Sequence, residues 1–131
     1  MRGALVAAGV LFAGAAQAQQ GPPPDYFIEG AALLRVASHM AAQCPDVQVD
    51  VDADTGLRLG VYDLLARDGW QIDDPRLHSE AAREAVLAAA SARYDTLGLE
   101  TPLVSDQVCP VARSEAEGGS ALGRLFRVDP G

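Results

Sequence analysis

The chain has 131 residues and a formal net charge of −8, and all ten of its basic residues are arginine. This length is enough for one domain with one core. The acidic balance excludes the basic surface on which nucleic-acid binding depends, and it also excludes attraction to anionic lipid. Hydrophobic residues make up 49% of the chain but aromatic residues only 5%, which favours a thin core of closely packed helices.

The N-terminus has the pattern of a secretory signal peptide over residues 1–18. Arg2 precedes an apolar run from Ala4 to Ala16, and Ala16-Gln17-Ala18 is a small-x-small cleavage site. The apolar run is too short to cross a hydrocarbon core of about 30 Å as a helix. We therefore expect a mature chain that begins at Gln19, is not inserted in the membrane, and is periplasmic or secreted.

The mature chain is expected to contain a Gly/Pro-rich spacer at residues 19–25 and a single helical domain at residues 26–128. Apolar spacing and helix start and stop residues predict four helices in this domain. Their approximate ranges are 26–43, 56–68, 75–97 and 107–128. Alternation typical of a strand occurs only over residues 47–51, where it is short and acidic, so no strand is expected. The expected fold class is all-α, a compact bundle of about four helices.

Cys44 and Cys109 are the two cysteines of the chain. Because an exported protein meets an oxidising compartment, they predict one intramolecular disulfide between the end of the first helix and the start of the fourth. The chain-entropy model assigns a loop of this length about 4 kcal/mol of stability. The alternative is a pair of free thiols, which fits this compartment poorly.

Residues 46–56 are predicted to form an acidic connection, the acidic segment, in which Asp50, Asp52 and Asp54 alternate and resemble the front half of a calcium loop. Such a loop requires Gly at its sixth position and Glu at its twelfth, where this chain has Thr55 and Val61. The favoured interpretation is a solvated acidic turn before a helix N-terminus. Calcium binding through the three aspartates stays as a weaker alternative, and no other metal or cofactor is expected.

Glu115 has the most unusual position, because a helical wheel places it among the apolar residues of the fourth predicted helix. Such a carboxylate is either a general acid with a raised pKa or the structural partner of an arginine. Arg83 and Arg113 are the candidate partners. Arg113, Glu115 and Ser120 form the candidate functional or structural polar cluster, and no residue is assigned a catalytic role.

The region around this cluster has a distinctive series of residues: Cys109, Arg113-Ser114-Glu115, Ser120, Gly123, Leu125 and Arg127. This series resembles the C-terminal signature of a family of small exported bacterial proteins with two cysteines, known as domain-of-unknown-function family 5333. Similar order and spacing are found at Cys44, Gly69-Trp70 and Tyr94 to Gly98, so that the resemblance covers most of residues 30–127. Mild departures are found at Ala112, Ala116, Leu122 and Phe126. The resemblance implies an all-helical two-cysteine domain and no particular activity.

The leading hypothesis for function is a non-enzymatic binding or accessory protein of the cell envelope. Its partner would be an envelope protein or a small ligand. One alternative is a small periplasmic hydrolase or lyase that uses Glu115 with His39 or His78, although neither histidine has a metal ligand or catalytic partner at recognisable spacing. The other is the calcium-binding module described above. An acid-stress chaperone is an analogy that rests on size and export alone.

Overall fold

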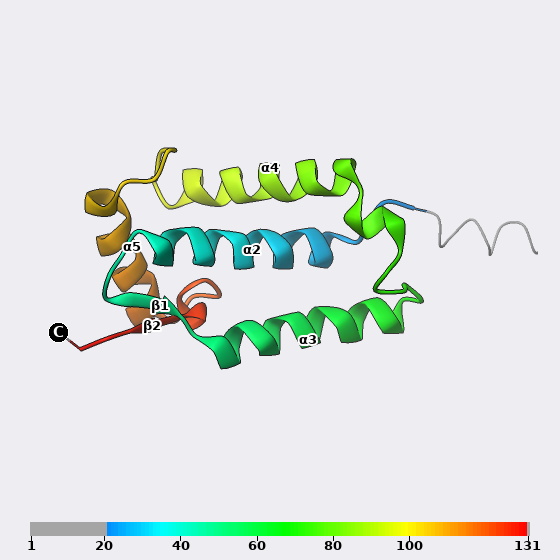
Figure 1. Cartoon of the computed structure of the whole chain (residues 1–131), viewed down its shortest axis with the longest axis horizontal. Helices are drawn as coiled ribbons and strands as arrows, with labels where there is room; N and C mark the ends of the chain where they lie inside the picture. Colours follow the sequence, from blue (N-terminus) through cyan, green and yellow to red (C-terminus); the bar gives the residue numbers. More distant parts are fainter. Residues whose placement is uncertain (1–20, 131) are drawn as a thin grey trace, which may run out of the picture.

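The computed structural model describes residues 21–130, so the predicted signal peptide at 1–18 and its cleavage site lie outside the described residues. The main elements are α2 (Asp25–Ala42), β1 (Val47–Val49), α3 (Val51–Arg67), η1 (Pro75–His78), α4 (Glu80–Thr96), α5 (Ser105–Gly118), η2 (Gly123–Leu125) and β2 (Phe126–Val128). The long helices α2, α3 and α4 lie side by side with α2 in the middle, and α5 crosses one end of this layer (Figure 1). The predicted compact helical bundle is therefore confirmed.

The main core lies at the end of the molecule where α5 crosses the layer. Helical spacing predicts that Tyr26, Leu33, Ala37, Met40 and Cys44 share one face. Leu33, Ala37, Met40 and Cys44 are indeed buried there, at most 7% exposed, whereas Tyr26 is only partly buried. Residues of the other elements complete this core: Val47, Ala90, Tyr94, Leu99, Val108, Ala112, Leu122, Leu125 and Phe126. As expected, most of these side chains are small or aliphatic.

The predicted disulfide is confirmed. Cys44 and Cys109 are bonded, with their Cα atoms 5.5 Å apart, and they are separated by 65 positions in the sequence. Both residues are buried, so that the bond fastens α5 to the chain just after α2.

The second helix begins earlier than the predicted start at Gly56. Asp50 is the N-cap of α3, and its side chain accepts a 3.0 Å hydrogen bond from the backbone N–H of Ala53. Asp52 and Asp54 lie in the first turn, where the helix dipole favours negative charge. The acidic segment is thus mostly the start of a helix and not a connection.

The third predicted helix is divided in two. Asp74 and Pro75 begin the short 3₁₀ segment η1, and α4 then begins at Glu80. Ser79 ends the first segment in extended conformation and caps the second, because its hydroxyl accepts a 3.1 Å hydrogen bond from the N–H of Ala82.

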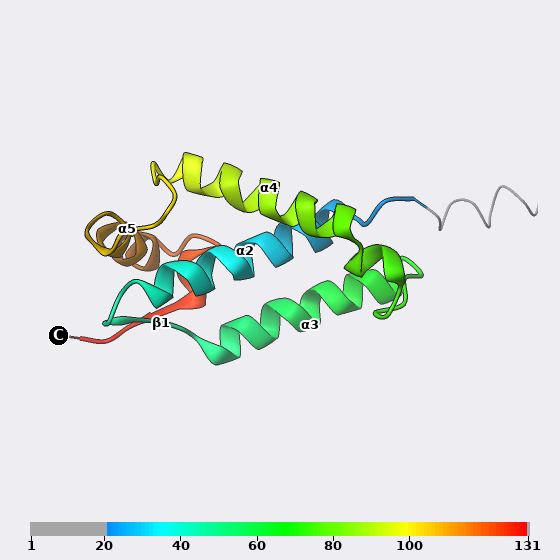
Figure 2. The same cartoon turned by 45° about the horizontal axis from the view of Figure 1, so that its top comes forward.

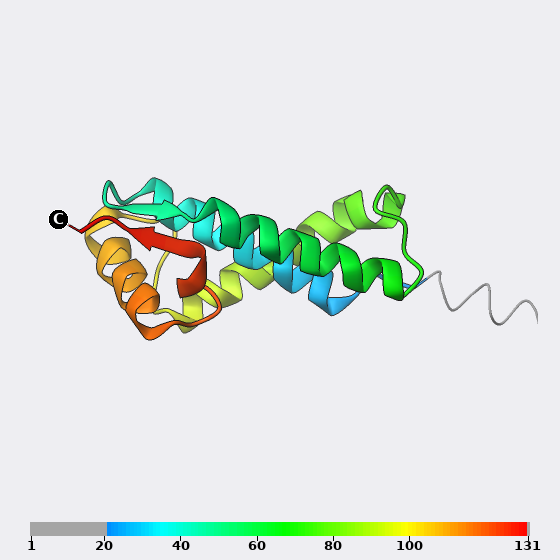
Figure 3. The same ribbon diagram turned by 90° about the horizontal axis from the view of Figure 1, so that it is seen from below.

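The prediction of a fourth helix as far as Val128 was wrong. α5 ends at Gly118, and Gly119 follows in the left-handed conformation, with φ of 67°, that commonly terminates helices. The chain then turns back through η2 into β2, which pairs antiparallel with β1 so that Val47 lies opposite Val128. The expectation of no strand was therefore also wrong. Figure 3 shows this two-stranded ribbon beside α5 at one end of the molecule.

The helix α3 packs more loosely than α2, because Leu65 is its one fully buried side chain. α3 and α4 lie on opposite sides of α2 (Figure 2). The α2 side chains Arg35, Ser38 and His39 are exposed and line hollows toward both neighbours. Among residues 21–130, no helix is long and apolar enough to cross a membrane.

Candidate functional site

An open groove follows α2 between its two neighbouring helices. Arg35, Ser38 and His39 lie on one exposed face of α2, since residues three and four positions apart are neighbours on a helix surface. We call these three residues the α2 ridge. The ridge lines two hollows, one toward α3 and one toward α4.

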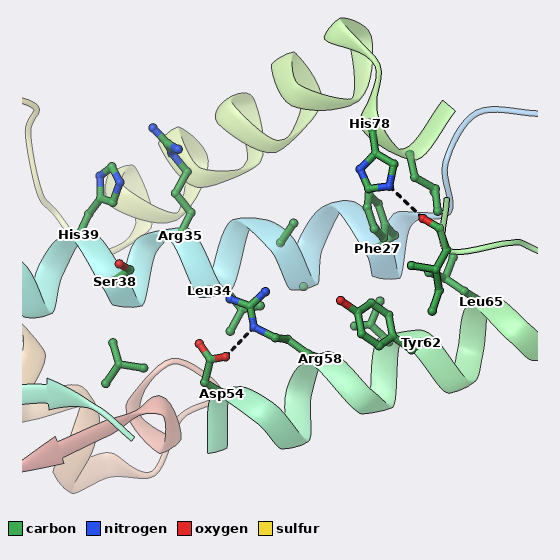
Figure 4. Close-up of a pocket in the computed structure, with 16 residues that line it drawn as sticks. Phe27, Leu34, Arg35, Ser38, His39, Asp54, Arg58, Tyr62, Leu65 and His78 are labelled. Carbon is green, nitrogen blue, oxygen red and sulfur yellow. Dashed lines mark hydrogen bonds and ion pairs between the residues drawn. The ribbon is translucent and has the colours of Figure 1, made fainter. Parts of the chain in front are cut away.

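The hollow between α2 and α3 has a volume of about 620 Å³ and is mainly apolar. Its apolar side chains include Phe27, Leu34, Val61, Tyr62, Ile72 and Leu77. The buried Gly30 lets the two helices approach, because a Cβ there would lie only 3.0 Å from Cγ2 of Val61. Figure 4 shows the ridge at one end of this apolar hollow, with Phe27 and Tyr62 toward the other end.

The hollow between α2 and α4 has a volume of about 630 Å³ and is more polar. Ser91, Tyr94 and Thr101 are the hydroxyl-bearing residues that line it, and no acidic residue does. Tyr94 is only 7% exposed, and its hydroxyl has no hydrogen-bond partner within residues 21–130. Burial raises the pKa of the Tyr94 hydroxyl, although nearby Arg35 acts in the opposite direction. The hydroxyl is therefore a buried donor beside the ridge without an acceptor of its own.

The charged and imidazole groups of the groove fall into two sets. Arg58 forms a 2.6 Å ion pair with Asp54, the only acidic residue that lines either hollow, and Nε2 of His78 lies 2.9 Å from the carbonyl oxygen of Ile72. By contrast, Arg35 and His39 make no hydrogen bond or ion pair with any other residue in the described part of the chain. An unpaired guanidinium thus lies in a groove of a chain whose net charge is −8.

The predicted polar cluster lies elsewhere, at the end of α5, and its pairing differs from the prediction. Glu115 accepts a 2.9 Å hydrogen bond from the Ser120 hydroxyl and forms no ion pair with a described arginine. Arg113 instead binds Asp46 through two hydrogen bonds of 2.7 and 3.0 Å. The hydrogen bond from Arg113 holds the pKa of Asp46 below its ordinary value. The predicted partner Arg83 is exposed on α4.

The structure does not bring Glu115 to the histidines at a common hollow. His39 lines both hollows and His78 lines the apolar one, whereas Glu115 lines neither. A hydrolase or lyase site of the predicted composition is therefore not assembled in the groove. Glu115 and Ser120 serve the turn after α5.

The three aspartates of the calcium hypothesis are separated by their roles at the start of α3. Asp50 caps the helix, Asp54 pairs with Arg58, and Asp52 is exposed. Over the described residues, no group of three His, Cys, Asp or Glu side chains is placed to hold a metal ion.

The α2 ridge was not predicted as a site. The sequence places Arg35 and Ser38 on the polar face of the first helix and His39 near its edge, but that pattern is typical of any solvated helix surface. The fold and the groove define a small, disulfide-linked helical protein with an open ligand-sized groove. No protein-family model matches the chain, and neither a curated protein nor a solved structure matches it.

Proposed function

We propose that the chain is an exported, non-enzymatic binding protein of the cell envelope and that the groove along α2 is its binding surface. The observation that carries this proposal is the unpaired Arg35 guanidinium, which lies between an apolar and a hydroxyl-lined hollow. Concave sites with mostly apolar walls and a few polar groups are typical of ligand sites. Because the Arg35 guanidinium has no ion-pair partner within residues 21–130, an anionic group of a ligand can pair with it.

The ridge is better suited to binding than to catalysis. A catalytic histidine usually has its ring oriented by a further hydrogen-bonding group. His39 has no such partner among the described residues, and the nearby Ser38 is exposed on the same helix face. The ridge can therefore hold a ligand, but it lacks the arrangement that would activate a nucleophile.

Export is supported by the Cys44–Cys109 disulfide, because disulfides persist in oxidising compartments. The N-terminal signal pattern points the same way. We also propose membership of the small two-cysteine family that the chain resembles, since the buried disulfide and the Glu115–Ser120–Gly123 contacts give structural roles to residues that carry the resemblance.

Export is tested by producing the full chain with a C-terminal tag in a Gram-negative host and separating the envelope from the cytoplasm. The expected product begins at Gln19 and is found in the periplasm or medium, with the disulfide formed. An Ala18→Trp variant, which spoils the cleavage site, should accumulate as precursor. An intact chain that begins at Met1 and stays in the cytoplasm would contradict export.

Binding through the groove is tested by capture from envelope extract with the mature, oxidised protein. Ala31→Trp fills the apolar hollow, and Ala92→Trp is its matched control on an exposed position of α4 outside both hollows. Material held by the wild type and by Ala92→Trp, but lost by Ala31→Trp, would support the groove. Equal capture by all three proteins would reject it. A Cys44→Ser/Cys109→Ser variant tests whether binding needs the disulfide-linked fold.

A further inference from the structure

We propose that the groove binds a long-chain carboxylate, a single acyl chain whose carboxylate lies at the α2 ridge and whose hydrocarbon tail lies in the apolar hollow. This inference rests on the proposed function of the groove as a binding surface. It adds the chemical class of the ligand and the direction in which that ligand lies.

The polar groups at the ridge are suited to an acceptor. Arg35 and Ser38 offer donors, and His39 offers a ring N–H. Tyr94, whose buried hydroxyl has no hydrogen-bond partner within residues 21–130, lines the adjoining hollow. An ionised carboxylate only accepts hydrogen bonds, and its pairing with a guanidinium is among the stronger protein contacts. No acidic residue lines the hollow toward α4, so that nothing there repels the anion.

The apolar hollow is suited to one hydrocarbon chain. It extends from His39 toward Phe27 along α2, a distance of about 18 Å for twelve residues of helix. Leu34, Tyr62 and Ile72 line it, and Ile72 is 54% exposed although it is large and apolar. A tail placed here would cover this apolar surface, and burial of apolar area is the main source of affinity for such a ligand. In Figure 4, Ser38 and His39 lie toward one end and Phe27 and Tyr62 toward the other, with Leu34 beside Arg58 between them.

The same charges favour a single carboxylate over an acidic amphipathic helix. Such a helix would present several carboxylates to the groove and would need several free cations. Of the two arginines that line the hollows, Arg58 is already paired with Asp54, and only Arg35 has no partner in the described structure. Asp54 would in addition repel a second anionic group near α3.

The test is a calorimetric titration of the mature, oxidised protein with laurate, below the concentration at which laurate forms micelles. Acetate and dodecyltrimethylammonium are the comparison ligands, since the first lacks the tail and the second reverses the charge. Saturable binding of one laurate is expected, with binding of either comparison ligand at least about tenfold weaker. Arg35→Gln should weaken laurate binding by about tenfold or more. Arg83→Gln changes an exposed position of α4 outside both hollows, and this variant should bind laurate as the wild type does.

The proposal is overturned if laurate does not saturate the wild type, if Arg35→Gln binds it unchanged, or if the cationic amphiphile binds equally well. Circular dichroism of Arg35→Gln separates lost binding from lost folding. Titration with an acidic amphipathic helical peptide separates the two levels of inference. Binding of the peptide but not of laurate, abolished by Ala31→Trp, would reject the acyl ligand and keep the groove. Rejection of the groove as a binding surface is a separate outcome, in which Ala31→Trp captures the same material from envelope extract as the wild type does.

Discussion

The hydroxyl of Ser120 donates a 2.9 Å hydrogen bond to Oε1 of Glu115, across the turn that follows α5. The same hydroxyl oxygen accepts a 2.9 Å hydrogen bond from the backbone N–H of Gly123. Glu115 is therefore linked to the backbone of Gly123 through the Ser120 hydroxyl. These two hydrogen bonds hold the segment that leads into β2 against the end of α5.

The carboxylate of Glu115 is expected to stabilise this turn. Glu115→Ala removes the acceptor for Ser120, and the free energy of unfolding should fall by about 1 kcal/mol, the usual contribution of one hydrogen bond. Glu115→Gln keeps an acceptor oxygen and should lose less. Urea denaturation measures both, with the exposed Glu117→Ala as the control. If Glu115→Ala and Glu117→Ala unfold at the same urea concentration, the contact has no structural role.

Gly123 is expected to tolerate no side chain. A Cβ at this position would overlap the backbone carbonyl of Glu115, and backbone cannot move aside as a flexible side chain can. Gly123→Ala should lower the free energy of unfolding by about 1–3 kcal/mol, as overpacking typically does. Gly118→Ala is the matched control, because a Cβ there meets nothing within 4 Å. Equal denaturation midpoints for the two variants would refute the close approach at Gly123.

The disulfide is expected to supply a large share of the stability. Because Cys44 and Cys109 are 65 positions apart, the chain-entropy model assigns the disulfide about 4 kcal/mol. Cys44→Ser/Cys109→Ser should therefore unfold at much lower urea, and a reducing agent should destabilise the wild type similarly. The double variant should be insensitive to the reducing agent. A wild type whose midpoint is unchanged by reduction would count against this role.

Asp74 is expected to make stability depend on pH below 4. Hydrogen bonds from the Arg76 side chain and then from its backbone N–H lower the pKa of Asp74 from 3.8 to about 2. A depressed pKa means that the contribution is complete above the unfolded value of 3.8 and is lost as the pH falls through about 2.

Melting temperatures measured from pH 5 to pH 2 check this contribution. The wild type should lose more stability over that range than Asp74→Asn, which cannot ionise, while the exposed neighbour variant Asp73→Asn should follow the wild type. Parallel curves for the wild type and Asp74→Asn would show that the carboxylate of Asp74 does not contribute.

Local signals in the sequence predicted most of the helical fold correctly. The spacing of Leu33, Ala37 and Met40 identifies the buried face of α2, because a helix brings such positions onto one side. Asp74 and Gly69 mark an N-cap and a left-handed helix end for the same reason, since capping involves residues only a few positions apart. The cysteine pairing was predicted from there being only two cysteines in the sequence and from the expected export to an oxidising compartment.

The errors arose where a distant partner decides the local structure. Val47 to Val49 form a strand only because Phe126 to Val128 pair with them from the other end of the domain. Glu115 looked misplaced on an apolar face because helical spacing assumes that the helix continues past it. In the structure the chain turns at Gly119, and this turn brings the Ser120 hydroxyl back to the Glu115 carboxylate.

The sequence by itself determined the helical fold class, the buried face at the end of α2 and the disulfide, because these depend on periodicity and on the number of cysteines. The tertiary structure alone decided that Arg35, Ser38 and His39 form the ridge of a groove. A polar helix face becomes a site only when neighbouring helices lie on both sides of it, and the loose packing of α3 against α2 leaves that face open.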